Sequence, residues 1–512
     1  MLVYPNVTLK WLHSVAVLLY AILVCGPGSA FAAKDWSGEV LYFVLLDRFA
    51  DGDSGNNFKV QRGNPGGYHG GDIKGLTQQL DELSDLGVTA LWINPVQKQM
   101  PNPMYAQAPA KLGIPEFQHF GFHGYWIEDF EAMEPHFGSV ADLKQLVDEA
   151  HKRGIKVLLD VVYNHSGYNS KYNERKTSDG VSWMRTAEGN CEVDAIKCRV
   201  GGLPDFKTEI PEVREYLLQA NIRLAKQTGL DGFRLDTYKH VETDFWLEHR
   251  KRTRAEVSQD FFLLAEYWGG TASSLDPFFA RDEVDSGFDF SFKGSCESFA
   301  NGRGRSIAFG SYLGKRHSIR KGYQVAHYMS THDEPMALAN LGGDKAKFRL
   351  CVAVQMTSIG IPVIYYGEEV GRGGSEWPTN RNDMPWGDRS IYPGHGVARD
   401  ESLRDFYKAL LRLRQQHPAL TRGSYTLLST PQEKLVAYQR TDLDSGDQVI
   451  LVANRDPDVV QTDYPAPEAW IGKPVIDAIS GAPVQVEGGR IKLDMAPVSV
   501  RILTTPTRKL VP

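Results

Sequence analysis

The sequence has no excess of basic residues, and this lack argues against nucleic acid as a partner. Its 57 Lys and Arg are outnumbered by 63 Asp and Glu, the formal net charge is −6, and no basic cluster is present. Internal repeats and low-complexity tracts are not evident either. At 512 residues, the chain is long enough for a domain of about 250 residues or more and an additional one.

Long apolar runs are also lacking, with one exception near the N-terminus. Lys10 precedes an unbroken apolar run from Val15 to Cys25, which is followed by the small-residue site Ala30-Phe31-Ala32. A membrane-spanning helix needs about 20 residues, so this run favours an export signal cleaved after Ala32. The alternative is a retained membrane anchor. We expect an exported protein, secreted or periplasmic, with no membrane association after cleavage.

Cysteine is scarce, and the five cysteines form no pattern typical of a metal site. Four remain once the signal is removed. Cys191 and Cys198 are close together in a loop-like segment of an exported chain, which favours a disulfide bond between them. Cys296 and Cys351 are expected to be buried thiols.

Strand and helix patterns alternate through Tyr366, which indicates an α/β fold of the TIM (β/α)8 barrel type. The predicted strands include residues 40–49, 88–94 and 155–160. Apolar spacing predicts helices around Leu76, Leu80, Leu83 and Leu86, around Leu143, Leu146, Val147 and Ala150, and over residues 403–415.

Two regions depart from this alternation. Residues 166–203, between the third and fourth strands, are long for a barrel loop, so we expect a short excursion domain there. After His417, short alternating strands such as 435–440, 448–454 and 490–493 predict a C-terminal all-β domain. The predicted division is a signal peptide, the first part of the barrel, the excursion domain, the second part of the barrel and the C-terminal domain, over residues 1–32, 33–165, 166–203, 204–416 and 417–512.

Acidic residues stand where three of the predicted strands end. Residues 229–241 read G-L-D-G-F-R-L-D-T-Y-K-H-V and deliver Asp236, and two later strands deliver Glu266 and Asp333. In a barrel, these strand ends meet at the rim where active sites lie. A single strand-end Asp is more often a helix cap or an ion-pair partner. Three such acids, however, can flank one scissile bond from several directions.

With the segments D-V-V-Y-N-H (160–165) and L-P-D-F (203–206), the sequence resembles the α-amylase superfamily of retaining glycoside hydrolases. The motifs occur in the family's order and span most of the chain. The resemblance implies that Asp236 is the nucleophile, Glu266 the general acid and base, and Asp333 the carboxylate that stabilises the transition state. It also implies that the C-terminal domain is a β-sandwich.

The chemistry of retaining glycosidases agrees with these roles. It needs one ionised and one protonated carboxyl group, roughly 5–5.5 Å apart. Arg234 lies two residues before Asp236, on the same face of the strand, and can keep that carboxylate ionised. The aromatic neighbours Tyr267 and Trp268 are expected to raise the pKa of Glu266.

The resemblance also implies a set of substrate-binding residues. Tyr125 is expected to lie under the sugar at the cleavage point, whereas Trp126 is expected to pack in the core. Arg381 is expected either to touch a distal sugar or to form a surface ion pair. The full set is Tyr125, His123, His165, Arg234, Lys239, His240, His332 and Arg381.

The resemblance also implies calcium as the cofactor, at two sites that offer the carboxylate, amide and carbonyl oxygens that Ca²⁺ prefers. The first would use Asn164, Asp205 and the main-chain carbonyl of His240. A further ligand common in the family would fall near Ile196, which cannot serve. The second would use Asp51, Asp53, Asn56, Asn57, the Gly70 carbonyl and Asp72. Without a metal, such a cluster of Asp, Gly and Asn is a turn.

The resemblance therefore predicts an α-amylase that hydrolyses α-1,4 bonds in starch or maltooligosaccharides, with retention, through a covalent glucosyl-enzyme. The alternatives within the superfamily are cyclomaltodextrinase or neopullulanase, a glucanotransferase and α-glucosidase. A non-catalytic glucan-binding protein is a remote alternative, because all three carboxylates are present. The expected partner is an α-glucan, including cyclodextrins among the alternatives, and the chain is expected to be a monomer.

Overall fold

The structure is a computed structural model that describes residues 35–506, except 187, 390, 392 and 429–432. The predicted signal peptide, residues 1–32, lies outside the described residues. Among the helices of the described part, none is both long and apolar enough to cross a membrane.

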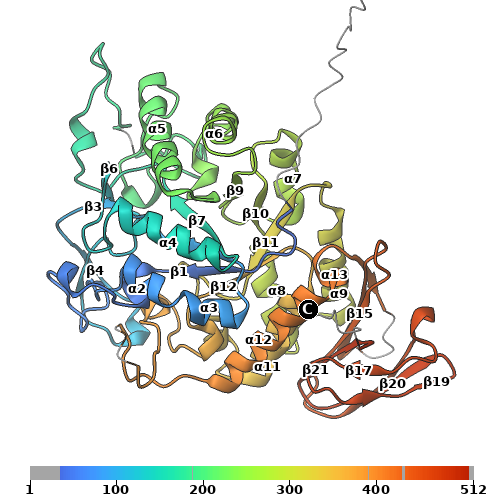
Figure 1. Cartoon of the computed structure of the whole chain (residues 1–512). Coiled ribbons are helices and arrows are strands. Elements are labelled where there is room, and N and C mark those ends of the chain that lie inside the picture. The colour runs from blue at the N-terminus through green and yellow to red at the C-terminus, as the bar shows by residue number, and fades with distance from the viewer. Residues whose placement is uncertain (1–34, 187, 390, 392, 429–432, 507–512) are drawn as a thin grey trace, which may run out of the picture. The chain divides into compact units, whose positions relative to one another are not determined.

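Eight parallel strands close into a barrel, as the alternating pattern predicts (Figure 1). In chain order, each strand pairs with the next, and the last pairs with the first. The strands are β1 (Leu41–Val44), β2 (Ala90–Ile93), β7 (Lys156–Val161), β8 (Gly232–Leu235), β9 (Phe262–Ala265), β10 (Ser286–Phe288), β11 (Gln324–Tyr328) and β12 (Ile361–Tyr365).

The first strand is shorter than predicted. Residues 40–49 were expected to be one strand, but β1 ends at Val44, and Leu46–Phe49 form the short helix α1. The turn is fixed by the side chain of Asn94, which accepts a hydrogen bond from the Leu46 main-chain nitrogen (2.8 Å). Within the helix, Asp47 pairs with Arg48 and accepts hydrogen bonds from the main-chain nitrogens of His69 (2.9 Å) and Gly70 (3.2 Å), which tie this turn to the next loop.

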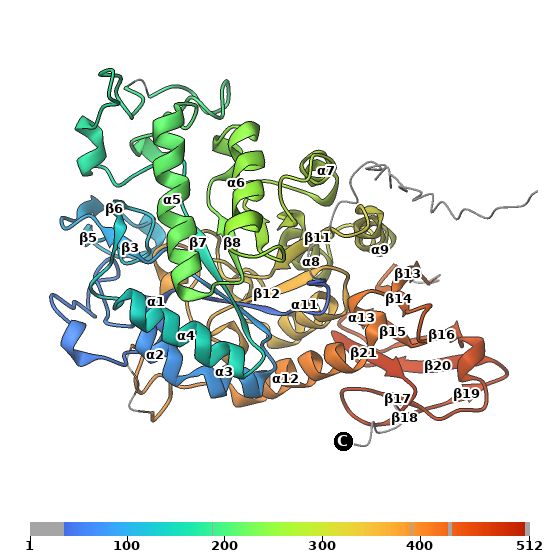
Figure 2. The ribbon, with the colours of Figure 1, turned by 45° about the horizontal axis from the view of Figure 1, so that its top comes forward.

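Helices surround the barrel in Figures 1 and 2. They are α2 (Ile73–Gln78), α3 (Leu80–Leu86), α4 (Val140–Lys152), α5 (Pro211–Thr228), α6 (Thr243–Glu256), α7 (Ala272–Ala280), α8 (Ser291–Ala300), α9 (Ser306–Lys315), α10 (Ala337–Asn340), α11 (Lys345–Thr357) and α12 (Glu401–Gln416). Helix α4 buries the predicted apolar stripe and begins with a capping box at Ser139. The helix predicted around Leu76 to Leu86 is instead two helices, α2 and α3, which meet at Gln79.

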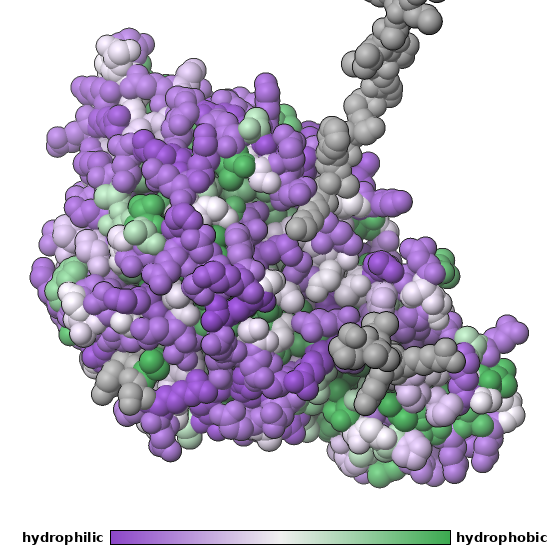
Figure 3. Space-filling model, viewed as in Figure 1, coloured by the Kyte–Doolittle hydropathy of each residue, from purple (hydrophilic) through white to green (hydrophobic). Residues whose placement is uncertain are grey.

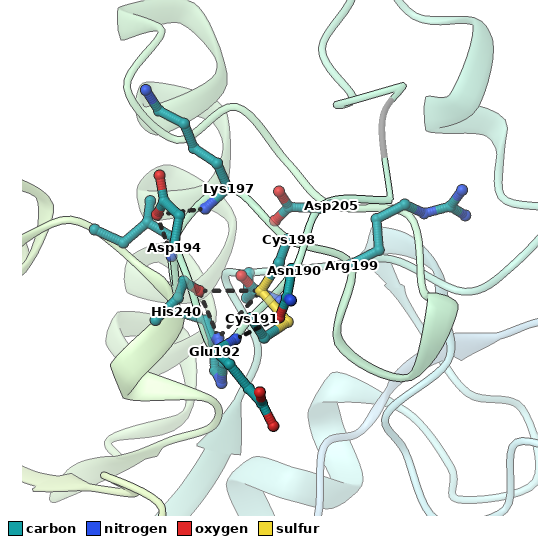
Figure 4. The surroundings of a disulfide bond; sticks show 12 residues. Asn190, Cys191, Glu192, Asp194, Lys197, Cys198, Arg199, Asp205 and His240 are labelled. Carbon is teal, nitrogen blue, oxygen red and sulfur yellow. Dashed lines mark hydrogen bonds between the residues drawn. A yellow bond between two sulfur atoms is a disulfide. The ribbon is translucent and has the colours of Figure 1, made fainter.

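The excursion between β7 and β8 contains little regular structure. It has the short helices η3 (Lys171–Glu174) and η4 (Val200–Gly202), and the predicted disulfide Cys191–Cys198 closes a loop within it (Figure 4). Cys296 and Cys351 are free and buried, as predicted.

The C-terminal domain consists of two antiparallel sheets that share one core. One contains β13 (Ser424–Leu427), β14 (Leu435–Thr441), β15 (Gln448–Asn454), β21 (Ser499–Thr504), β17 (Val475–Asp477) and β18 (Pro483–Val484), and the other contains β16 (Val460–Pro465), β20 (Arg490–Met495) and β19 (Val486–Glu487). Leu435 and Ile450 of the first sheet and Ile491 of the second lie in that core. This arrangement is the predicted sandwich.

The C-terminal domain also packs on the barrel helices. The Tyr425 hydroxyl donates to the Gly310 carbonyl in α9 (2.7 Å), and the buried Arg440 donates to the Thr357 carbonyl in α11 (2.6 Å). In the view of Figure 3, apolar residues are more frequent over this domain, at lower right, than over the barrel helices. These polar contacts give this domain a structural connection to the barrel.

Candidate active site at the barrel rim

The structure brings the three predicted acids together. Asp236 follows β8, Glu266 follows β9, and Asp333 lies in the loop after β11. All three line one cavity of about 520 Å³ at the carboxyl ends of the strands. The predicted substrate-binding residues His123, Tyr125, His165, Lys239, His240, His332 and Arg381 line the same cavity. Arg234 lies beneath it.

Arg234 is the centre of the charge network under the cavity. It is 1% exposed, and one of its terminal nitrogens lies 2.7 Å from Asp236 Oδ1, while the other lies 2.5 Å from Glu266 Oε1. The first nitrogen also contacts Asp160 in β7 (2.9 Å). Strand pairing explains the geometry, because Asp160 is the register partner of Arg234, and Leu235 is that of Ala265. One guanidinium therefore bridges the predicted nucleophile and acid, which is compatible with the roughly 5–5.5 Å of a retaining enzyme.

The pKa values of two of the carboxyl groups are shifted in opposite directions. Burial, together with the negative charges of Asp236 and Asp333, raises the pKa of Glu266 to about 8, although Arg234 opposes the shift. Burial also acts on Asp333, but neighbouring His332, Arg381 and Arg234 more than reverse it, so its pKa lies below the ordinary value. Glu266 can thus hold a proton at neutral pH while Asp333 remains charged.

A main-chain contact fixes the orientation of Glu266. The Thr237 N–H donates to Glu266 Oε2 (2.9 Å). Thr237 has a left-handed backbone (φ 47°), which is unusual for a residue with a branched side chain. The residue next to the predicted nucleophile therefore positions the predicted acid.

Several histidines present unpaired nitrogens at the cavity. His123 and His165 each have a buried Nε2, and His332 a buried Nδ1, without a hydrogen-bond partner among the described residues. Burial lowers the pKa of His165, and that of His332 to about 3, so neutral rings face the cavity. A buried nitrogen without a hydrogen bond lowers the stability of the fold. Sugar hydroxyls, which both donate and accept hydrogen bonds, would satisfy them.

Tyr125 lies in the wall of the cavity, beside these histidines. Its ring stacks on His332, with centroids 5.2 Å apart, and its hydroxyl donates to Asp160 Oδ2 (2.7 Å). Trp126 was expected to be a core residue, but it is only partly buried and lines the cavity, so that expectation was wrong. The short loop from Gly121 to Gly124 turns both rings toward the cavity instead of the core.

Arg381 is not a surface residue, because it is 9% exposed. Its Nε donates to the His332 carbonyl (2.9 Å), and a terminal nitrogen donates to Asp333 Oδ1 (3.1 Å). Instead of the surface ion pair considered from the sequence, a buried arginine pairs with the more exposed Asp333 and positions it. Contact between Arg381 and a distal sugar stays a prediction.

Sequence reasoning did not assign several residues of the site, Thr237 among them. Asp160 could have been found, since it ends a strand at the start of the D-V-V-Y-N-H motif. His119, Trp268 and Trp377 also line the cavity. His119 resembles the other histidines in having a buried, unpaired Nε2. No local sequence pattern predicts that His119 and Trp377 belong to the site. Their rings lie close together (centroids 5.6 Å apart), but they come from segments distant in the chain.

The predicted calcium loop near the N-terminus has features that fit a cation. Asn56 and Asn57 each have a buried Oδ1 with no partner among the described residues. Gly70 leaves room for this arrangement, because a Cβ there would lie 2.4 Å from Asn57 Oδ1. Asp72 is buried, and Asp51 contacts the Asn57 amide (2.6 Å). Asp53 differs from the others, since its carboxylate turns outward to Lys74 (3.1 Å).

The other predicted calcium site has a different environment. Asp205 is 1% exposed and lies near Asn164 and His240, as expected. However, Arg185 of the excursion lies 2.7 Å from Asp205 Oδ2. The His240 ring points to the excursion loop, where its Nδ1 lies 2.6 Å from the Ala195 carbonyl (Figure 4). A positive side chain therefore already faces the carboxylate at this site.

The fold and the site define a barrel hydrolase that uses carboxylates, and comparison with known proteins identifies the family. The model of the α-amylase catalytic domain matches residues 43–190 and 195–388. The chain belongs to the α-amylase family of glycoside hydrolases, which confirms the resemblance seen in the sequence.

Individual relatives agree with this assignment. Neopullulanase 2 of Thermoactinomyces vulgaris is 31% identical over 499 residues, covering 92% of this chain and 79% of that protein. A cyclomaltodextrinase of a Bacillus species is 30% identical over 460 residues, covering 84% and 75%. Among solved structures, an Anoxybacillus α-amylase superposes with a TM-score of 0.80 at 28% identity, covering 93% of this chain and 100% of that one.

Proposed function

We propose that this protein hydrolyses α-1,4-glucosidic bonds in starch or maltooligosaccharides, with retention of anomeric configuration. The observation that carries the proposal is the pair Asp236 and Glu266, joined by one Arg234 guanidinium at the floor of a cavity. The raised pKa of Glu266 supports its role as the acid. Neutral histidines and Tyr125 supply the polar and aromatic surface that a pyranose needs.

In the first step, the Asp236 carboxylate attacks the anomeric carbon while Glu266 donates its proton to the glycosidic oxygen. The bond to the leaving sugar breaks, and a glucosyl ester with Asp236 forms. In the second step, Glu266 removes a proton from water, whose oxygen attacks the same carbon. The ester breaks, so Asp236 becomes a carboxylate again and Glu266 recovers its proton.

The remaining residues would stabilise the charge that develops between these steps. The ionised Asp333, positioned by Arg381, faces the sugar ring as it gains positive charge. His123, His165 and His332 would bind hydroxyls of this sugar, while Lys239 and His240 would contact the leaving group.

Replacement of Asp236 tests the assignment of the nucleophile. In the Asp236→Asn variant, kcat on maltoheptaose should fall by at least about 10⁴-fold, since the covalent step is lost. Circular dichroism and binding of maltoheptaose should remain close to those of the unsubstituted protein. Retained turnover would contradict the proposed mechanism.

Cyclomaltodextrinase is the second candidate, because two relatives that share at least 30% identity are a cyclomaltodextrinase and a neopullulanase. A product profile over time on soluble starch, maltoheptaose and β-cyclodextrin separates the two. An α-amylase should quickly lower the viscosity of starch and release mixed short products. Preference for β-cyclodextrin would favour the second candidate.

We also propose that the loop near the N-terminus binds Ca²⁺, which would coordinate the unpaired amide oxygens. The ligands would be Asp51, Asn56, Asn57, the Gly70 carbonyl and Asp72. Asp53 would take part only by turning away from Lys74.

The apolar N-terminal run supports export to the periplasm or the medium. We propose a monomer, to be tested by light scattering.

A further inference from the structure

Arg185 contacts three carboxylates where the excursion meets the barrel. Its terminal nitrogens donate to both oxygens of Glu209, at 2.7 and 2.8 Å, and its Nε lies 2.7 Å from Asp205 Oδ2. One terminal nitrogen also lies 3.3 Å from Glu242. The Arg185 side chain is 11% exposed and that of Asp205 is 1% exposed. The ion pair with Asp205 is thus largely shielded from water.

The main chain ties the same residues together. The Arg185 N–H donates to the Asp205 carbonyl (2.8 Å), so the guanidinium is held over this carboxylate by its own backbone. Glu242, which follows the loop of His240, also accepts a hydrogen bond from the Thr208 hydroxyl. One arginine therefore connects the excursion, the segment after Pro204 and the loop after β8.

Asn164 completes the cluster on the other side of Asp205. With its amide nitrogen turned inward, Asn164 donates to Asp205 Oδ1 (3.2 Å) and to the His240 carbonyl (2.9 Å). With the amide oxygen turned inward, three oxygens would converge, and only a cation would satisfy them. In the first orientation, Asp205 Oδ1 has a hydrogen-bond donor in Asn164, and Oδ2 has an ion-pair partner in Arg185.

Near Ile196, where the missing ligand would fall, the neighbouring oxygens of the described residues already have partners, since Asp194 Oδ1 accepts a hydrogen bond from the Ile196 N–H (3.0 Å). The adjacent Ala195 carbonyl faces His240 Nδ1 at 2.6 Å, and the disulfide closes the loop beside it (Figure 4). Calcium usually takes six to eight oxygen ligands. Asn164, Asp205 and His240 offer fewer, and the charge that an ion would contribute is already present on Arg185.

We propose that the Arg185 guanidinium replaces the calcium ion at the junction of Asn164, Asp205 and His240. The excursion is joined to the barrel by an arginine and carboxylate cluster, and the protein needs no metal at this position. Removal of Arg185 would leave Asp205, Glu209 and Glu242 without their shared cation, and would convert the junction into a site that binds Ca²⁺.

The test compares the full-length protein with Arg185→Ala, using Arg175→Ala as a matched control. Arg175 lies in the same segment and stacks over Trp183 (3.8 Å), but has no ion-pair partner among the described residues. Protein stripped of Ca²⁺ with EGTA is titrated with Ca²⁺ by calorimetry. The melting temperature is measured without Ca²⁺ and with about 2 mM Ca²⁺, which is on the order of 10³ times a micromolar Kd.

The unsubstituted protein and the Arg175→Ala variant should bind the same number of Ca²⁺ ions, at most one. The Asp51→Asn variant should not bind that ion. Arg185→Ala should melt about 5–10 °C lower without calcium. It should bind one more Ca²⁺ ion than the unsubstituted protein, and added Ca²⁺ should restore at least about half of the lost melting temperature. If this variant does not fold, Arg185→Gln, which removes the charge but keeps much of the side-chain length, should show the same order with smaller shifts.

Three results would overturn the replacement. The first is a second Ca²⁺ bound to the protein with Arg185 intact. The second is an ion that Asp51→Asn retains at unchanged affinity. The third is an Arg185→Ala protein whose melting temperature equals that of the control or does not respond to Ca²⁺. None of these readouts depends on catalytic activity.

Discussion

Arg234 and Arg185 each hold three carboxylates with one guanidinium, but their surroundings differ. Arg234 lies under the cavity and is 1% exposed, with Asp160, Asp236 and Glu266 as its partners. Arg185 lies at the edge of the barrel, with Asp205, Glu209 and Glu242 as its partners, and Glu209 is 45% exposed.

The difference shows how one chemical group serves two purposes. Around Arg234, burial is so complete that one guanidinium cannot keep every carboxyl group ionised, and Glu266 retains a proton. Around Arg185, water reaches Glu209, and pairing with Arg185 outweighs burial and lowers the pKa of that carboxyl group, whereas burial raises the pKa of Asp205 to about 8. The protonated carboxyl group of the first cluster faces the cavity and can act as an acid, whereas the second cluster joins two segments.

The largest effect should come from exchanging each arginine for methionine. Arg234→Met should lower kcat/KM on maltoheptaose by about 10³-fold or more and destabilise the fold by about 3–5 kcal/mol, since buried carboxylates lose their cation. Arg185→Met should lower kcat/KM by about tenfold or less, through displacement of Lys239 and His240. Equal losses of activity would break the comparison.

The pH profile should sharpen the assignment of the acid. Because the pKa of Glu266 is raised to about 8, kcat/KM should fall about tenfold per pH unit above that value, as the proton is lost. The same raised pKa favours folding at low pH and weakens it as pH rises through about 8. A profile that is flat from pH 7 to 10 would contradict the role of Glu266.

The smallest effect should come from the disulfide. Replacing Cys191 and Cys198 with serine should cost about 2 kcal/mol of stability, by chemical denaturation, because the closed loop is short. The combination with Arg185→Ala should cost more than the sum of the separate changes, since both hold the excursion near His240. Simple additivity would show that the arginine and the disulfide act independently.

Much of the fold and the catalytic centre could be predicted from the sequence, because local patterns carry them. Asp236, Glu266 and Asp333 each follow an apolar strand, and barrel geometry then brings such ends to one rim. The Arg185 cluster was missed because its partners are 20 to 57 residues away and no periodicity links them. Trp126 was assigned to the core, since hydrophobicity alone does not reveal whether an aromatic ring faces a cavity.

The hydrogen bond from the Thr237 N–H to Glu266 has a consequence for variation at this position. The donor belongs to the main chain, so exchange of the threonine side chain leaves it in place. Only a change that removes the N–H, such as proline, or that rotates the peptide would release the carboxyl group. The orientation of the Glu266 carboxyl group therefore depends on the backbone conformation at residue 237, and the side chain at this position can vary with the substrate.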